Sequence, residues 1–263
     1  MNITAMIALN FALSALCYSK RLLSRSGALS GFVIGSGIGL ALGWQGWLIL
    51  MAFFFGGTTA TFLGQKKKEQ RGVAQEDHGR RRWNHAWANA GCGVFCAGLS
   101  WVSTRACNLE LAEAWRWAFV ACFAAALSDT LSSEFGQVAD QQPWLITTGE
   151  TVPIGTDGGV TRAGILVGIL GAALMTLLAR FVSLVPVRAT LPVLLAGISG
   201  NLLDSLLGAT LQKRGVLNND TVSLGNTLAG AALGYFGFWF MRALPLWLQE
   251  AGIHHLFILN LFI

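Results

Sequence analysis

The chain has 263 residues, of which 54% are hydrophobic and only 12% are charged, and its formal net charge is +5. Its mean hydropathy is +0.56. This composition, with 32 glycines, excludes an ordinary water-soluble domain. It predicts a polytopic membrane protein.

Apolar segments long enough to cross a hydrocarbon core of about 30 Å fill nearly the whole chain. In chain order they are 2–19, 27–43, 46–64, 85–104, 114–134, 160–182, 187–209 and 223–248. Because they leave no room for a separate soluble domain, we expect residues 1–263 to form a single integral membrane domain. The predicted fold class is all-α, a transmembrane helical bundle of about eight spans (7–9).

The first segment is followed, rather than preceded, by basic residues, which is the wrong order for a cleavable signal peptide. Twelve of the 18 lysines and arginines fall in alternate connections on one side of the predicted bundle. They are Lys20, Arg21, Arg25, Lys66, Lys67, Lys68, Arg71, Arg80, Arg81, Arg82, Lys213 and Arg214. The positive-inside rule predicts that this side faces the cytosol, with both termini non-cytosolic, in a bacterial inner membrane or an equivalent membrane.

Two polar islands interrupt the apolar segments near their predicted cytosolic ends, one around Asp129 and Glu134 and the other around Asp204. An acidic residue inside a spanning helix costs about 2.5–3.5 kcal/mol on insertion scales and usually marks a functional site. Hard oxygen ligands without His or Cys nearby suit Mg²⁺. We therefore expect all three carboxylates to be catalytic metal ligands. Asp129 and Glu134 can serve one site only if the helix ends near Gly136, and an interhelical hydrogen-bond network is the structural alternative.

The two islands share the pattern D-[TS]-L-x₅-Q, which runs from Asp129 to Gln137 and from Asp204 to Gln212. Both copies end helices that are predicted to run in the same direction. The repeat predicts two parallel helix ends that present paired carboxylates, an arrangement that can hold metal ions on a polyphosphate.

Two predicted inner loops flank these islands, the basic loop 65–84 and the Gly/Thr-rich loop 136–160. The usual role of such a basic loop is to fix topology and contact anionic lipid. Arg82, however, is close to Asn89 in the sequence, so the end of the loop could supply positive charge to a phosphate bound near Asn89. The second loop leads into a helix, where backbone N–H groups can bind phosphate. An ordinary glycine-rich turn with Thr161 as the helix N-cap is the alternative.

Five ordered motifs resemble those of one integral membrane family, which contains plant phytyl-phosphate kinases and animal transmembrane protein 19. The motifs are Trp87–Gly91, Ser128–Gly136, Ile146–Gly149, Val152–Gly159 and Leu203–Gln212. Leu131 stands where that family often has Trp, and Asp157 where it often has Ser. Neither departure removes a carboxylate.

The resemblance implies a kinase that phosphorylates phytyl or geranylgeranyl monophosphate to the diphosphate, with Mg²⁺ as cofactor and CTP as the donor by kinship to polyprenol kinases. The expected partners are the prenyl monophosphate lipid, the nucleoside triphosphate and membrane lipid, and no nucleic acid. The residues then expected to bind nucleotide or phosphate are Arg82, Asn89, Thr147, Thr148, Gly149, Gly155, Thr156, Asp157, Gly158, Gly159, Asn201, Ser205, Gln212 and Asn226.

Three other functions remain open at this point. A secondary transporter of an anion or lipid could use the same acids for coupling, with broken helices and a site near the membrane midplane. A lipid phosphotransferase that uses a CDP-activated headgroup would carry a D-x-x-D-G-x-x-A-R core, which is missing from the chain. A non-catalytic assembly factor would tolerate loss of Asp129.

Overall fold

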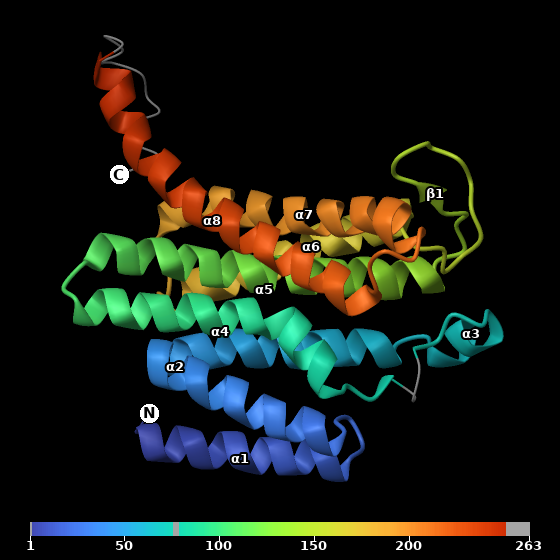
Figure 1. The fold of residues 1–263 in the computed structure, drawn as a ribbon, viewed down its shortest axis with the longest axis horizontal. Coiled ribbons are helices and arrows are strands. Elements are labelled where there is room, and N and C mark those ends of the chain that lie inside the picture. Colours follow the sequence, from blue (N-terminus) through green and yellow to red (C-terminus); the bar gives the residue numbers. More distant parts are fainter. Residues whose placement is uncertain (1, 76–78, 251–263) are drawn as a thin grey trace.

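The computed structural model describes residues 2–75 and 79–250. Within these two ranges eight α-helices follow one another (Figure 1): α1 (Ile3–Ser19), α2 (Arg25–Phe62), α3 (Gln65–Gln70), α4 (Trp83–Arg105), α5 (Leu109–Val138), α6 (Arg162–Phe181), α7 (Thr190–Leu207) and α8 (Asn219–Glu250). Each predicted apolar segment is helical over most of its length, which confirms the all-helical class.

The long helix α2 consists of two halves separated at Gly43, whose backbone has φ 69° and ψ −162°. This conformation is accessible to glycine because it has no Cβ. The two halves run in opposite directions past each other (Figure 1). The break falls at the predicted boundary between segments 27–43 and 46–64.

Among the described residues, four helical stretches are long and apolar enough to span a membrane. They are Arg25–Phe62, Leu109–Val138, Arg162–Phe181 and Val187–Gln212, and α1 is a shorter apolar helix. The number of eight spans and the side of the membrane that each end faces stay predictions.

Helix α5 forms the centre of the bundle and contacts α2, α4, α6, α7 and α8. Its residues from Trp117 to Leu127 are fully buried. Small residues allow this crowding, because a Cβ added at Gly230 would lie 2.8 Å from the carbonyl oxygen of Ala121. The core thus holds α5 rigidly and sets the position of Asp129 near the helix end.

Between α5 and α6 the chain forms a short antiparallel pair, β1 (Trp144–Leu145) with β2 (Gly159–Val160). The sequence predicted only a loop here, because two-residue strands carry no recognisable alternation. Helix α7 is preceded by a 3₁₀ turn, η2 (Val187–Ala189), and followed by a π-helical segment, η3 (Gly208–Gln212).

The polar connections gather at one end of the bundle. Figure 1 shows α3, β1 and the connection from α7 to α8 at this end, whereas α1 begins and α8 ends at the opposite side. We call the first the loop end.

Candidate functional site

A mainly polar cavity of about 720 Å³ opens at the loop end. Its walls come from the segment that precedes α4, the ends of α5 and α7, the glycine-rich loop before α6 and the start of α8. The cavity therefore lies at the end of the bundle, and elements distant in sequence meet around it.

Asp129 and Asp204 both line this cavity, and their carboxyl groups lie close enough to influence each other. Ser133 Oγ donates to Asp129 Oδ1 at 3.5 Å. Asp204 Oδ1 is buried and, within the described part of the chain, has no hydrogen-bond partner. Two adjacent ionised carboxylates repel each other, so a proton or a cation between them would stabilise the pair. The donor set fits Mg²⁺, which takes one or two carboxylates and completes its shell with phosphate oxygens and water.

The repeated pattern has a structural counterpart. Both of its acidic residues and both of its glutamines, Gln137 and Gln212, line the cavity. Gln212 lies in η3 and its Nε2 donates to Asp157 Oδ1 at 2.9 Å. Since the π-helical turn changes the helix phase after Asp204, it directs Gln212 toward the glycine-rich loop.

Glu134 does not join the carboxylate pair as expected. Helix α5 continues past Gly136 to Val138, so Asp129 and Glu134 diverge by about 140° around the axis. Glu134 instead accepts from Lys68 Nζ at 2.6 Å and from Gln75 Nε2 at 2.6 Å. Within residues 2–75 and 79–250, no group of three or more His, Cys, Asp or Glu side chains is arranged to hold a metal ion. The three-carboxylate arrangement is thus not formed, and Glu134 is an ion-pair partner in the cavity wall.

The arginine that reaches the cavity is Arg81, together with Arg80, and not Arg82. Arg81 forms a backbone bridge with Leu23, and Arg82 has extended φ and ψ of −97° and 174°. The extended backbone at Arg82 turns its side chain away from that of Arg81. Arg81 therefore faces inward, over the Phe53 ring at 5.7 Å from its centroid, while Arg82 is exposed.

The glycine-rich loop approaches the end of α7 closely. A Cβ at Gly208 would lie 2.8 Å from the amide nitrogen of Gly158. The residues Gly155, Thr156, Asp157, Gly158 and Gly159 therefore line the cavity beside Asp204.

The entrance of α6 is not the open anion cradle that the sequence suggested. Thr161 caps the helix by accepting from the Gly164 amide at 3.0 Å, and Gln141 Oε1 accepts from the Ala163 amide at 3.1 Å. These first amides are satisfied by protein groups. The alternative interpretation, with Thr161 as N-cap, is correct for this turn.

Five further residues expected at phosphates lie outside the cavity wall. Thr147, Thr148 and Gly149 are exposed in the turn beyond β1. Asn201 Nδ2 donates to Ser128 Oγ at 3.0 Å, and Asn226 Nδ2 donates to the Ala125 carbonyl at 3.4 Å. Both asparagines therefore join neighbouring helices to α5 by hydrogen bonds.

The cavity brings together all of the other expected residues. Those that line it are Asn89, Asp129, Glu134, Gly155, Thr156, Asp157, Gly158, Gly159, Asp204, Ser205 and Gln212. Sequence reasoning missed Arg80, Arg81 and His85. His85 Nδ1 lies 2.7 Å from Asp220 Oδ1, and its position four residues before Asn89, on the same helix face, was the available signal.

Comparison with known proteins identifies the family of this chain. A family model described as Integral membrane protein DUF92 matches residues 8–235. An uncharacterized membrane protein of Synechocystis is 36% identical over 215 residues, which cover 81% of this chain and 82% of the relative. An uncharacterized membrane protein of Methanocaldococcus jannaschii is 32% identical over 225 residues, 84% of this chain and 88% of the relative.

A plant protein is also similar. Protein VTE6, chloroplastic, of Arabidopsis thaliana is 34% identical over 213 residues, which cover 80% of this chain but 63% of the plant protein. No solved structure matches the chain. The family expected from the five motifs is confirmed, and the chain belongs to the integral membrane protein family DUF92.

Proposed function

We propose that the protein is a membrane-embedded prenyl-phosphate kinase. It transfers the γ-phosphoryl group of a nucleoside triphosphate, CTP by the family resemblance, to phytyl or geranylgeranyl monophosphate at the cytosolic face. An oxygen of the acceptor phosphate forms the new P–O bond as the bond between the γ-phosphorus and the β,γ-bridging oxygen breaks. The products are the prenyl diphosphate and the nucleoside diphosphate.

The observation that carries this proposal is the pairing of Asp129 with Asp204 in a polar cavity that also contains Arg81. Phosphoryl transfer depends on positioning and charge neutralisation more than on covalent catalysis. Asp129 and Asp204 would hold Mg²⁺, which when bound neutralises charge on the phosphates. Arg80 and Arg81 line the same space and supply positive charge from the protein.

The remaining residues of the cavity have roles consistent with this reaction. The acceptor monophosphate is already ionised, so the reaction needs no strong general base. Ser133 donates to Asp129 and orients it. Asn89, Ser205 and the loop 155–159 line the cavity, and we assign to them the contacts with phosphate oxygens.

A secondary transporter fits the geometry less well. Such a protein would place its site near the midplane, between helices broken there. Here the acids lie at the loop end, and α5 continues without a break through Asp129 to Val138. The two halves of α2 meet at the opposite end of the bundle (Figure 1).

The direct test is an assay of the purified protein in detergent with geranylgeranyl monophosphate, Mg²⁺ and γ-³²P-labelled CTP, ATP, GTP or UTP. We expect labelled geranylgeranyl diphosphate with CTP as the preferred donor, and no product in EDTA. Absence of diphosphate with all four nucleotides, from protein that stays folded and monodisperse, would contradict the proposal.

A further inference from the structure

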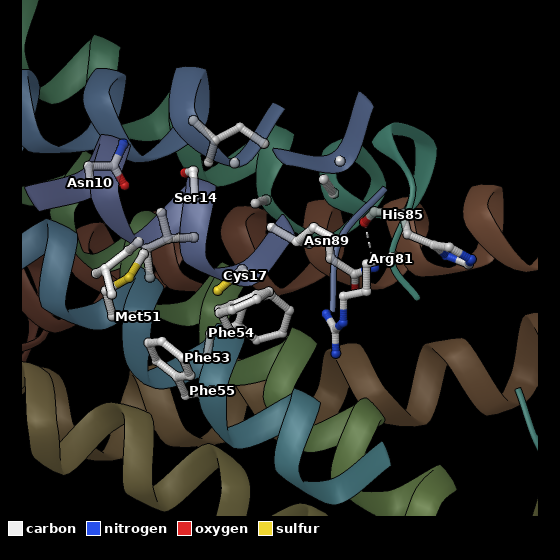
Figure 2. Close-up of a pocket in the computed structure, with 18 residues that line it drawn as sticks. Asn10, Ser14, Cys17, Met51, Phe53, Phe54, Phe55, Arg81, His85 and Asn89 are labelled. Carbon is white, nitrogen blue, oxygen red and sulfur yellow. Dashed lines mark hydrogen bonds between the residues drawn. The ribbon is translucent and has the colours of Figure 1, made fainter. Parts of the chain in front are cut away.

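A second, narrow groove adjoins the polar cavity and is mainly apolar. It lies between α1, both halves of α2 and the start of α4, and Figure 2 shows its lining side chains. Ile34, Leu50, Met51, Phe53 and Phe54 supply much of the surface. The groove is therefore suited to a hydrocarbon chain rather than to a polar ligand.

The groove and the cavity share three residues. Arg81, His85 and Asn89 line both, and these side chains lie together at one end of the groove (Figure 2). The guanidinium of Arg81 lies over the ring of Phe53, so a cation stands where the apolar surface meets the polar one. A ligand that fits both spaces has an anionic head and an apolar chain attached to it.

One glycine keeps the groove open. Gly27, Gly31, Gly35 and Gly39 recur every four residues on the first half of α2. Gly27 packs closely against the Arg81 carbonyl, Gly35 against Asn10 and Gly39 against Met6. Gly31 differs, because the nearest atoms to an added Cβ would be Leu23 Cδ1 at 3.8 Å and Ser14 Oγ at 4.0 Å. Gly31 borders free space where the other members of the repeat border protein.

The groove is small. Its free volume is about 70 Å³, and by this measure one water-sized group needs about 10–15 Å³, so it holds about five to seven such groups. That number corresponds to a single five-carbon isoprene unit.

We infer that this groove binds the first isoprene unit of the prenyl monophosphate, next to its phosphate, with Arg81 at the phosphate and the rest of the chain among membrane lipids. The inference rests on the proposed function, since it assigns a place to that acceptor. It predicts that the protein recognises the unit bonded to the phosphate and responds little to chain length. Geranyl, farnesyl and geranylgeranyl monophosphates then bind with similar contributions from this groove.

The first test uses binding, so that it does not depend on turnover. A geranylgeranyl monophosphate carrying a diazirine on its first isoprene unit is photolysed with the purified protein, and the labelled peptides are identified by mass spectrometry. We expect labelling of the segments around Cys17, Gly31 and Met51, competed by farnesyl monophosphate but not by phosphatidic acid. Labelling spread over lipid-facing helices, or competition by phosphatidic acid, would identify a non-specific lipid site and overturn the inference.

The second test fills the groove. In Gly31→Phe we expect loss of the crosslink and a rise of at least about tenfold in the KM for the prenyl monophosphate, because each methylene-sized contact contributes about fourfold. The KM for the nucleotide stays unchanged. Gly98→Phe is the matched control, because a Cβ at Gly98 has nothing within 4 Å, and it should behave as wild type.

The two proposals fail in different ways. An unchanged crosslink and an unchanged acceptor KM in Gly31→Phe overturn the groove and leave the kinase intact. Specific, Gly31-dependent crosslinking without diphosphate formation by the wild type overturns the kinase and leaves a binding site for a prenyl monophosphate.

Discussion

Lys68 and Glu134, 66 positions apart, form an ion pair with 2.6 Å between Nζ and Oε2, and their side chains are 1% and 2% exposed. Lys68 Nζ also donates to the carbonyl oxygens of Ala60 and Thr61 at the end of α2. The pair joins the basic loop to α5 next to the cavity.

Removing one partner of this pair should destabilise the protein strongly. We expect Lys68→Met to cost about 3–5 kcal/mol of unfolding free energy, because it leaves Glu134 charged and buried. The double variant Lys68→Met/Glu134→Met should recover part of the loss. The measurement is unfolding in detergent, with Lys67→Met as control, since Lys67 pairs with the exposed Asp140. Equal losses in Lys68→Met and Lys67→Met would contradict the account.

The neighbouring arginines Arg81 and Arg82 should differ in their effect on activity. Arg81 lines the cavity and Arg82 is exposed. We expect Arg81→Ala to lower kcat/KM for the prenyl monophosphate by about 10- to 100-fold, as for the loss of a hydrogen bond to a charged group. Arg82→Ala should change it less than about twofold. A larger loss of kcat/KM in Arg82→Ala than in Arg81→Ala would contradict the assignment of Arg81 to the phosphate.

Much of this architecture was predictable because it depends on local sequence. The apolar segments locate the helices within a few residues, and the gap between 27–43 and 46–64 locates the break at Gly43. The repeat D-[TS]-L-x₅-Q predicted that Asp129 and Asp204 lie on two helix ends that meet. Both residues do line the same cavity.

The errors concern relationships that local sequence does not determine. Arg81 rather than Arg82 faces inward because a backbone bridge to Leu23 sets the phase of an extended segment. Glu134 forms an ion pair with Lys68 because α5 extends beyond Gly136 and α3 packs beside α5. This arrangement depends on tertiary packing. Neither could be derived from spacing along the chain.

The glycine-rich loop offers a matched pair of substitutions. Gly158 and Gly149 both have φ of 73°, so alanine at either position carries a similar backbone strain of about 1–2 kcal/mol. Only Gly158 also approaches another backbone, that of Ala209, whereas a Cβ at Gly149 meets nothing within 4 Å. We expect Gly158→Ala to lower turnover and the Tm well beyond Gly149→Ala. Equal effects would show that the contact between the loop and η3 is not needed.

Acid should loosen the contact between α3 and the end of α5. Hydrogen bonds from Lys67 and then Arg71 lower the pKa of Asp140. A depressed carboxyl pKa stabilises the folded state above the ordinary value of about 3.9, and this stabilisation is lost as the pH falls through the lowered value. The difference in Tm between wild type and Asp140→Asn should therefore shrink as the pH falls from about 6 to below 3.9. A constant difference over this range would contradict the assignment.

The central claim is that Asp129 and Asp204 act together on a phosphate-bound cation. It is tested most directly by the turnover of geranylgeranyl monophosphate in Asp129→Asn and Asp204→Asn, with Asp140→Asn as a control acid outside the cavity wall. Asparagine keeps the shape of each side chain and removes its charge. We predict that both cavity variants fold, as judged by their Tm, and form no diphosphate, while Asp140→Asn retains activity. Wild-type turnover in either cavity variant would contradict the account.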